Sequence, residues 1–322
     1  MKTILITGGA GFIGSNLTKT LLDQGHQIVC LDNFNDFYDP DIKQQNILPF
    51  VLNNRYSLVQ GDLRNSTELK NLFADHPIDV VIHLAAQAGV RPSIENPQLY
   101  YDVNVMGTVN LLEAMRSAGC TKMIFGSSSS VYGNNEKVPF SESDPVDNPI
   151  SPYAATKKAG ELLCHTFHHL YGMDILCLRF FTVYGPSQRP EMAIPKFTQA
   201  ILEGRSITMF GDGNSERDYT YVGDIVQGIV LAMDKVKGFD IINLGESKTI
   251  PLKNQIQLIE KETGRMANIQ QLPMQPGDVQ RTNADISRAK EFLGYDPKVD
   301  IETGIRNYVA WHIENVKSRD LR

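Results

Sequence analysis

The chain begins with Met1-Lys2 and then Thr3-Ile4-Leu5-Ile6-Thr7-Gly8-Gly9-Ala10-Gly11-Phe12-Ile13-Gly14, the stretch that decides the fold. Its apolar run predicts a buried strand, and its glycines predict a tight turn into a helix. Glycine lets the backbone approach a ligand closely and lets a helix pack against the strand. The start of the helix offers N–H donors and the positive end of its dipole, which bind phosphate. The stretch therefore predicts a strand–turn–helix unit that binds a phosphate-bearing ligand.

Strands and helices continue to alternate along the first half of the chain. Further buried strands are predicted at Gln27–Leu31, Tyr56–Gln60, Val80–His83, Lys122–Gly126 and Ile175–Arg179. Helices are predicted at Phe12–Gln24, Thr67–Ala74, Gln98–Ser117 and Pro152–Tyr171. Strands that alternate with helices form a parallel sheet with helices on both faces. We therefore predict an α/β protein with a doubly wound parallel sheet.

An acidic residue after the second strand narrows the ligand to a dinucleotide. Asp32 follows Leu31 and stands eighteen positions beyond Gly14. A carboxylate there accepts hydrogen bonds from the ribose hydroxyls of adenosine and repels a 2′-phosphate, which favours NAD over NADP. Taken alone, the glycine spacing also suits ordinary strand–helix turns, and Asp32 could simply open the turn into Asn33 and Phe34. The two features together predict NAD.

Residues at the ends of later strands complete the expected cofactor site. Asp62 ends the third strand segment, where it can contact the adenine amino group. The small side chains after Leu84 let a cofactor lie over the edge of the sheet. The cofactor contacts expected from these segments are Gly8, Gly11, Phe12, Ile13, Gly14, Asp32, Asn33, Asp62, Leu63, Leu84, Ala85 and Ala86.

The strand–helix rhythm changes after Gly185, where prolines interrupt it. Helices are still expected at Asp224–Met233 and Pro251–Thr263, with short strands between them. This pattern predicts a smaller C-terminal α/β lobe packed against the first without a flexible linker. We expect residues 1–185 to form the NAD-binding domain, with later segments returning to it. Residues 186–322 are expected to form mainly the substrate-binding lobe.

Composition excludes several classes of partner. The net charge of -6 and the lack of a long basic run argue against nucleic acid. Neither a signal peptide nor the roughly 18 consecutive apolar residues of a membrane span is present, so no membrane partner is expected. The cysteines lack Cys-x-x-Cys spacing, which favours reduced thiols and a cytoplasmic location. His165, His168 and His169 share a helix face without carboxylate or thiolate partners, so no metal site is expected.

A hydroxyl cluster and a Tyr–Lys pair supply the candidate chemistry. Serines occupy positions 127–130 after the fifth strand, and Tyr153 stands four residues before Lys157 near the start of a helix. Residues with this spacing lie on one helix face, so the two side chains project together. A nearby ammonium favours the phenolate, and we expect it to lower the pKa of Tyr153 towards neutrality, which would make the tyrosine a usable base.

These motifs together resemble the extended short-chain dehydrogenase/reductase family, which contains the sugar-nucleotide epimerases and dehydratases. The resemblance extends over nearly the whole chain. The residues that carry it are Gly8-x-x-Gly11-x-x-Gly14, Asp32, Asp62, His83-Leu84-Ala85-Ala86, Ser127–Gly133, Tyr153-x-x-x-Lys157, Arg179–Pro186, Glu216-Arg217-Asp218-Tyr219 and Pro276-Gly277-Asp278.

The resemblance implies a Rossmann-type NAD enzyme in which Ser128, Tyr153 and Lys157 are catalytic, with Tyr153 and Lys157 also contacting the cofactor. It places Phe180 and Val183 near the nicotinamide. It also implies that Arg217 binds the diphosphate of a UDP-sugar and that Asp278 binds the uridine ribose. A homodimer interface is implied at the helices Gln98–Ser117 and Pro152–Tyr171.

Two serines distinguish this chain from other branches of the family. Members that eliminate water carry an Asp-Glu pair in place of Ser129-Ser130, and decarboxylases of UDP-glucuronate usually carry a glutamate at the position of Ser130. Both comparisons favour a 4-epimerase. Three segments are most similar to UDP-glucuronate 4-epimerases, which work through a 4-keto intermediate; these segments are 31–36, 83–91 and 184–192.

A carboxylate substrate also has a physical basis in the sequence. Arg91 and Arg189 follow strand ends, where ligands bind in open α/β sheets, and a guanidinium can bind a carboxylate bidentately. Each arginine could instead bind diphosphate or form a surface ion pair. The alternatives for the whole chain are a 4-epimerase of UDP-glucose or UDP-N-acetylglucosamine, a UDP-glucuronate decarboxylase, and an NAD-binding sensor. The expected substrate contacts are Arg91, Ser128, Ser129, Ser130, Thr182, Arg189, Arg217 and Asp278.

Overall fold

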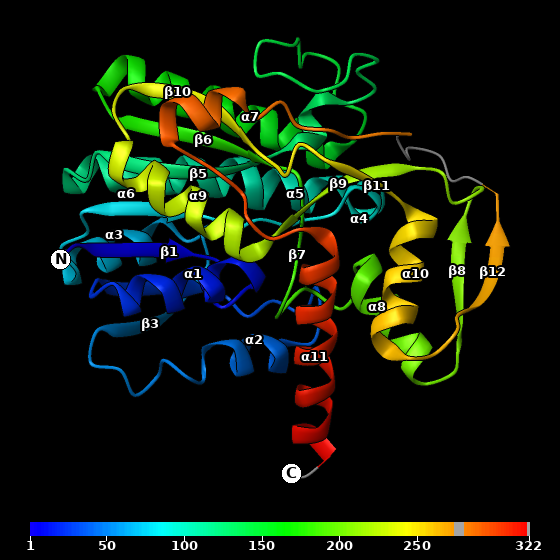
Figure 1. Cartoon of the computed structure of the whole chain (residues 1–322). Helices are drawn as coiled ribbons and strands as arrows, with labels where there is room; N and C mark the ends of the chain where they lie inside the picture. Colours follow the sequence, from blue (N-terminus) through cyan, green and yellow to red (C-terminus); the bar gives the residue numbers. More distant parts are fainter. Residues whose placement is uncertain (274–279, 321–322) are drawn as a thin grey trace.

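A seven-stranded parallel sheet with the order β10-β6-β5-β4-β1-β2-β3 forms the centre of the molecule (Figure 1). The structure is a computed structural model that describes residues 1–273 and 280–320. The six predicted strands are confirmed, with small differences at their ends. The sheet consists of β1 (Thr3–Thr7), β2 (Gln27–Asp32), β3 (Tyr56–Gln60), β4 (Val80–His83), β5 (Lys122–Ser128), β6 (Asp174–Phe180) and β10 (Phe239–Leu244).

The strand order reverses beside β1, and this reversal positions the site. β1 pairs with β2 on one side and with β4 on the other, all in parallel. Because the connections leave this point in opposite directions, the loops after β1 and β4 separate and open a crevice at the carboxyl ends of the strands. The glycine-rich turn after Thr7 lies at this crevice.

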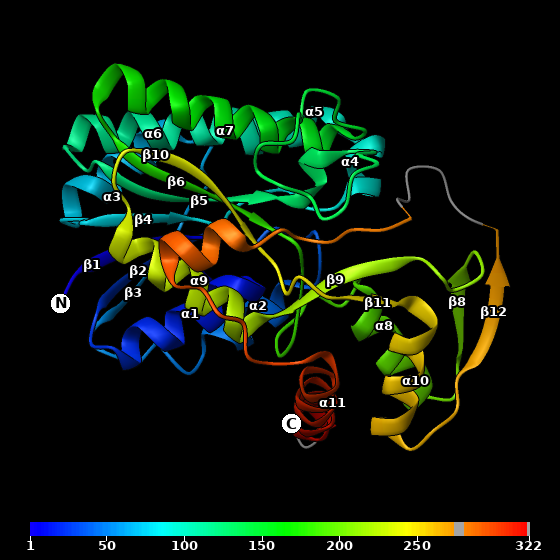
Figure 2. The same cartoon turned by 45° about the horizontal axis from the view of Figure 1, so that its top comes forward.

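Helices cover both faces of the sheet (Figure 2). Residues of β1 alternate between the two layers, since successive side chains of a strand point to opposite faces. Ile4 and Ile6 belong to one buried cluster, and Leu5 belongs to the other. This confirms the doubly wound architecture. One layer contains α1 (Phe12–Asp23), α2 (Pro40–Ile47) and α9 (Val222–Lys235), and the other contains α3 (Ser66–Asp75), α6 (Gly107–Ala118) and α7 (Pro152–Tyr171).

The helix expected at Gln98–Ser117 is interrupted by a π-helical turn. It consists of α5 (Pro97–Tyr100), the π-helical segment η1 (Tyr101–Met106) and α6. Asn104 lies within η1 and is buried, and its amide bonds both the N–H and the carbonyl of Gln87, at 2.7 and 3.0 Å. The same amide donates to Thr156 Oγ1 at 3.0 Å. The π turn therefore ties the loop after β4 to α7.

A second, smaller group of elements packs beside the sheet. It contains the three-stranded sheet β11-β9-β7 and the two-stranded sheet β12-β8. Helices α8, α10 and α11 pack together in a third buried cluster. In the described part of the chain, no helix is both long enough and apolar enough to cross a membrane. The bounds are β7 (Thr182–Tyr184), α8 (Ala193–Leu202), β8 (Ser206–Phe210), β9 (Glu216–Tyr221), β11 (Thr249–Pro251), α10 (Leu252–Thr263), β12 (Asn268–Leu272) and α11 (Ile301–Asp320), and the short helical segments are α4 (Val90–Glu95), η2 (Ser129–Tyr132) and η3 (Ala289–Leu293).

Candidate active site

A cavity of about 530 Å³ opens at the carboxyl ends of the strands. The structure brings every residue expected to contact the cofactor to its wall. These are Gly8, Gly11, Phe12, Ile13, Gly14, Asp32, Asn33, Asp62, Leu63, Leu84, Ala85, Ala86, Tyr153, Lys157, Phe180 and Val183.

The glycine turn is packed so closely that side chains would not fit at two of its positions. A Cβ on Gly14 would lie 2.3 Å from the carbonyl oxygen of Gly8. Gly8 has a φ of +71°, and a Cβ there would lie 2.8 Å from the backbone nitrogen of Ala85. No side chain caps the start of α1, whose N-cap residue is Gly11. The uncapped N–H groups face the cavity, as a pyrophosphate site requires.

Asp32 at the end of β2 is buried, and its carboxylate accepts two hydrogen bonds and forms one ion pair. Its carboxylate accepts hydrogen bonds from the backbone N–H groups of Ala10 at 3.2 Å and Phe34 at 2.9 Å. Lys43 Nζ lies 3.8 Å from the same carboxylate. The bond to Phe34 is the turn contact that the sequence left open, and Asp32 also reaches the cavity wall.

Asp62 is held firmly at the same end of the cavity. Arg64 donates two hydrogen bonds from its guanidinium, at 2.9 and 2.8 Å, and Asn33 donates a third at 2.9 Å. These donors, the Arg64 guanidinium above all, hold the pKa of Asp62 well below its usual range. Asp62 therefore remains an acceptor at physiological pH.

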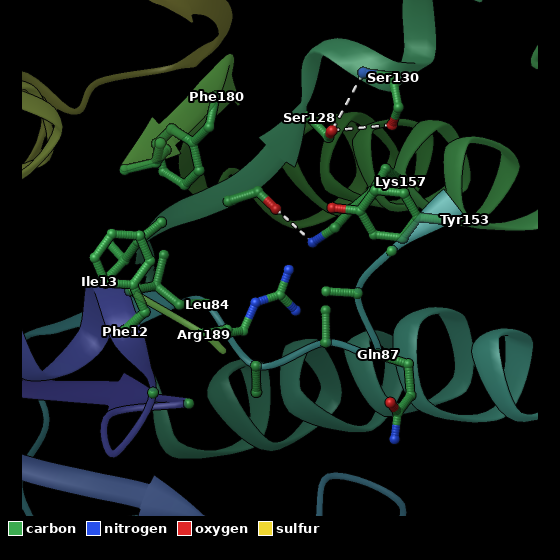
Figure 3. Close-up of a pocket in the computed structure, with 18 of the residues that line it drawn as sticks. Phe12, Ile13, Leu84, Gln87, Ser128, Ser130, Tyr153, Lys157, Phe180 and Arg189 are labelled. Atoms are coloured by element: carbon green, nitrogen blue, oxygen red, sulfur yellow. Dashed lines mark hydrogen bonds between the residues drawn. The ribbon is translucent and has the colours of Figure 1, made fainter. Parts of the chain in front are cut away.

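Tyr153, Lys157 and Ser128 surround one part of the cavity (Figure 3). Lys157 is buried, and its Nζ donates to the carbonyl of Gly126 at 2.6 Å. Ser128 Oγ accepts two hydrogen bonds from Ser130, one from the backbone N–H at 3.2 Å and one from the hydroxyl at 2.9 Å. Because both bonds are accepted, the Ser128 proton is available to a further partner.

The prediction that the pKa of Tyr153 is lowered is wrong, because the structure gives a raised pKa. Burial raises the pKa of Tyr153 above its ordinary value, while a hydrogen bond with Ser128 and the charge of Arg189 act in the opposite direction. Burial also lowers the pKa of Lys157 to about 8. The helical spacing predicted the shared face, but the desolvation of Tyr153 outweighs the bond with Ser128 and the charge of Arg189.

A buried network of hydrogen bonds connects the elements that carry these side chains. Arg179 on β6 and Glu161 on α7 form a paired ion contact at 2.8 and 2.9 Å. Ser127 donates to Glu161 at 2.7 Å, and Arg179 also donates to the hydroxyl of Tyr132 at 3.0 Å. The network therefore connects β5, β6, η2 and α7 next to residues that line the cavity. Ser151 caps α7 by accepting from the N–H of Ala154.

The expected substrate residues divide into three groups. Ser128, Ser129, Ser130, Thr182, Arg189 and Arg217 line the cavity. Arg91 is not among the lining residues, and its guanidinium carbon lies 5.2 Å from the ring centre of Phe210 on β8. Asp278, with the rest of the Pro276-Gly277-Asp278 motif, lies outside the described residues.

Sequence reasoning missed several residues of the cavity wall. Lys43 lies on α2, whose start is marked by Asp39 and Pro40, a capping residue followed by a proline at the first helical position. That signal could have located the helix, although it says nothing of where Lys43 points. The other missed residues with polar or aromatic side chains are Asn35, Phe37, Tyr38, Gln87, Ser127, Phe140, Ser151, Phe181, Gln188 and Thr282. Among the described residues, no group of three or more histidine, cysteine or acidic side chains could hold a metal ion.

Comparisons with known proteins agree with this architecture. The family model described as GDP-mannose 4,6 dehydratase matches residues 5–308. The chain is 44% identical over 318 residues to the UDP-glucuronate 4-epimerase of Thermodesulfobacterium geofontis, with 98% of each protein covered. It is 39% identical to the UDP-glucuronic acid 4-epimerase from Bacillus cereus, solved in complex with UDP-glucuronic acid and NAD, with a TM-score of 0.91 that covers 97% of this chain and 99% of that one. The UDP-glucose 4-epimerase of Thermotoga maritima, solved with UDP-glucose, has a TM-score of 0.90 at 32% identity and covers 98% and 99% of the two chains.

Proposed function

The chain belongs to the extended short-chain dehydrogenase/reductase family of nucleotide-sugar epimerases and dehydratases, and from this premise we propose that it is an NAD-dependent 4-epimerase that interconverts UDP-glucuronate and UDP-galacturonate. The observation that carries the proposal is the position of Arg189. Its guanidinium enters the same cavity as Tyr153 and the hydroxyls of Ser128–Ser130 (Figure 3). A guanidinium binds a carboxylate through paired, charge-assisted hydrogen bonds. These donors suit a sugar that carries a carboxylate at C6.

NAD fits the glycine turn, because the close packing at Gly8 and Gly14 leaves the backbone of the turn facing the cavity. The uncapped start of α1 would hold the pyrophosphate, and Asp32 would accept the adenosine ribose hydroxyls. Lys157 would hold the nicotinamide ribose, with Phe180 beside the nicotinamide. When bound, NAD supplies a reversible acceptor for the hydride on C4 of the sugar.

The chain itself manages the proton of the C4 hydroxyl. As that hydroxyl becomes a ketone, Tyr153 Oη takes its proton and later returns it. Ser128, which bonds Tyr153 in this structure, would donate its proton to the sugar oxygen when the sugar is bound. The charge of Arg189 favours the phenolate form of Tyr153 against the cost of burial. We propose that Lys157, whose Nζ lies 6.0 Å from the centre of the Tyr153 ring, acts in the same direction. Inversion at C4 requires the 4-keto sugar to turn its opposite face before it is reduced.

The same 4-keto sugar has a ketone β to its carboxylate, and β-keto acids lose CO₂ readily. Thr182 and the serine cluster offer neutral donors to the carboxylate, while Arg189 offers a charge. We propose that these groups hold the carboxylate at an angle that disfavours C5–C6 cleavage. The serines at 129 and 130 place no negative charge beside it.

We also propose that the cofactor and the substrate are bound by different regions of the chain. Residues 1–185 would bind NAD. Two later elements complete this domain: β10 is a strand of the seven-stranded sheet, and α9 packs on one face of that sheet. Residues 186–322 would mainly bind the UDP-sugar, with Arg217 on the diphosphate and Asp278 on the uridine ribose. A cytoplasmic location is consistent with the four cysteines, which are buried and free.

A homodimer is the assembly that we propose. Large apolar side chains are exposed on η1 and α7, two elements that pack against each other. The helix α6, which continues η1, lies beside α7 on the same face of the sheet (Figure 2). Exposed apolar residues gathered on neighbouring helices mark interaction surfaces. The residues are Tyr101, Met106, Leu162, Leu170 and Tyr171.

A panel of UDP-sugars tests the proposed function. Purified protein is incubated separately with UDP-glucuronate, UDP-glucose and UDP-N-acetylglucosamine, and the products are identified by NMR. We expect UDP-galacturonate to form from UDP-glucuronate and expect the neutral sugars to react poorly. NAD is expected in the supernatant of the denatured protein. Preference for a neutral sugar, or recovery of mainly NADP, would overturn the proposal.

A further inference from the structure

Arg189 lines the cavity and has a carboxylate neighbour, Glu191, that is not among the lining residues. Glu191 Oε1 lies 3.2 Å from Arg189 Nε. Both oxygens of Glu191 are shielded from solvent, yet neither has a hydrogen-bond partner among the described residues. The contact is therefore an ion pair by distance without the geometry of a hydrogen bond. A shielded carboxylate in this state is poorly satisfied.

The remaining contacts of Arg189 hold its side chain without saturating it. Nη2 donates to the sulfur of Met192 at 3.6 Å, a weak acceptor. The guanidinium carbon lies 5.6 Å from the ring centre of Phe37. Neither neighbour offers the paired oxygens that a guanidinium binds best. The group is thus oriented towards Tyr153 and Lys157 (Figure 3) with donors to spare.

We propose that Glu191 competes with the substrate carboxylate for Arg189. This competition weakens the binding of the uronate carboxylate enough for Arg189 to release it during the reaction. This rests on the proposed function. A uronate that enters the site meets the Arg189 guanidinium, which Glu191 already pairs from beside the cavity. The net attraction on the uronate is therefore smaller than Arg189 alone would give. When the 4-keto sugar rotates to present its opposite face, its carboxylate leaves Arg189, and the guanidinium pairs with Glu191 instead.

Exchange of partners at Arg189 has a distinct kinetic consequence. Without the charge of Glu191, UDP-glucuronate should bind more tightly, and the turning step should become slower because Arg189 has no alternative partner. Substrate affinity and turnover therefore change in opposite directions, a pattern that general destabilisation of the fold does not produce.

Glu191→Gln tests the inference, because it removes the charge and retains the shape. We expect UDP-glucuronate to bind about five- to tenfold more tightly by calorimetry, as one partly buried ion pair allows. We also expect kcat for UDP-glucuronate to fall and binding of UDP and UDP-glucose to stay unchanged. In an Arg189→Ala background, Glu191→Gln should no longer affect uronate binding. Glu203→Gln is the matched control, because Glu203 pairs with Arg205 at the same two-residue spacing on the exposed surface.

The outcomes separate this inference from the proposed function. A wild-type enzyme that neither binds nor epimerises UDP-glucuronate overturns both. If the wild type epimerises UDP-glucuronate but Glu191→Gln binds it no more tightly, or gains equally for UDP-glucose, the role of Glu191 is wrong while the proposed function stands. Tighter uronate binding that persists without Arg189 also overturns the role.

Discussion

Lys43 and Asp32 form a buried ion pair at the end of the cavity where the adenosine is expected, with 3.8 Å between Nζ and Oδ1 and only 6% of each side chain exposed. Lys43 also donates to the backbone carbonyl and the side-chain oxygen of Asn35, at 3.1 and 3.0 Å. The pair is close to neutral as a unit. We therefore expect the choice between NAD and NADP to depend on both residues rather than on the carboxylate alone.

Asp32→Ala should shift the cofactor preference towards NADP. The substitution removes the charge that repels a 2′-phosphate and leaves the Lys43 ammonium to attract it. We expect the NAD-over-NADP ratio of dissociation constants, measured by calorimetry, to fall by at least about tenfold, or roughly 1.4 kcal/mol. Asp32→Ala combined with Lys43→Met should lose the NADP gain. An unchanged ratio in Asp32→Ala would show that the acid does not select the cofactor.

Tyr153→Phe should fold and retain NAD but lose activity by about 10²–10⁴, the contribution of one acid–base group. Its ring would keep the edge contact with Tyr100, whose ring centre is 6.3 Å away, so the packing changes little. Product formation is followed by NMR and retained NAD by absorbance after denaturation. Tyr100→Phe, which loses a bond to the Ala88 carbonyl, is the comparison and should cost much less. Near-normal turnover in Tyr153→Phe would remove this tyrosine from the mechanism.

Arg189→Ala or Thr182→Ala should lower epimerisation and raise the share of UDP-4-keto-pentose. Either change loosens the carboxylate and lets the C5–C6 bond reach the angle at which CO₂ leaves. Mass spectrometry of the products from UDP-glucuronate measures that share directly. Arg205→Ala alters an exposed arginine that pairs with Glu203 and should leave the share as in the wild type. If both cavity variants handle UDP-glucuronate normally, these residues do not hold the carboxylate.

His83 should make the fold sensitive to acid. Its ring is buried between the hydroxyls of Thr7 and Thr108, at 2.7 and 3.0 Å, and burial lowers its pKa from 6.5 to about 3. Between these two values the unfolded chain binds a proton that the folded chain does not, so stability falls as the pH drops through 6.5. At pH 5 the loss from this residue is about 2 kcal/mol relative to pH 7.5.

Urea unfolding of the wild type and His83→Asn at the two pH values measures that loss. The variant should be less stable at pH 7.5 but should lose about 2 kcal/mol less on acidification. His169→Asn, at an exposed position of α7, should follow the wild type. Equal acid sensitivity in wild type and His83→Asn would mean that His83 is not the group responsible.

Leu162→Glu should convert the proposed dimer into a monomer. Leu162 is 56% exposed on α7, and a charge at the centre of an apolar interface is costly to desolvate. Sedimentation velocity at micromolar concentration should give a dimer for the wild type and a monomer for the variant. Leu52→Glu is the control, because Leu52 is 96% exposed in the turn before β3. A monomeric wild type would contradict the proposed assembly.

Much of the fold follows from local patterns. The glycines after β1 could be interpreted correctly because their spacing reflects a turn built within a few residues. The helix predicted at Pro152–Tyr171 has the bounds found in the structure, since Ser151 caps it and Pro152 fixes its first turn. The residues of the cavity wall could be located because they follow strand ends, and parallel strands gather those ends at one edge.

Other features depend on contacts between remote segments. The π turn at Tyr101–Met106 is tied to Asn104, which bonds a different loop and α7. Lys43 and Asp32 meet only because the chain folds so that α2 brings Lys43 close to the end of β2. Arg91 and Arg189 have similar positions after strand ends, yet only Arg189 lines the cavity.

By itself, the sequence determined the parallel sheet, the glycine turn, and the shared helix face of Tyr153 and Lys157, because periodicity, glycine geometry and helical spacing act over a few residues. Tertiary structure decided which arginine enters the cavity, that Glu191 lies beside it, and that the pKa of Tyr153 is raised rather than lowered. Desolvation is the physical reason for the last point. It depends on every neighbour that excludes water from a group, and those neighbours come from distant parts of the chain.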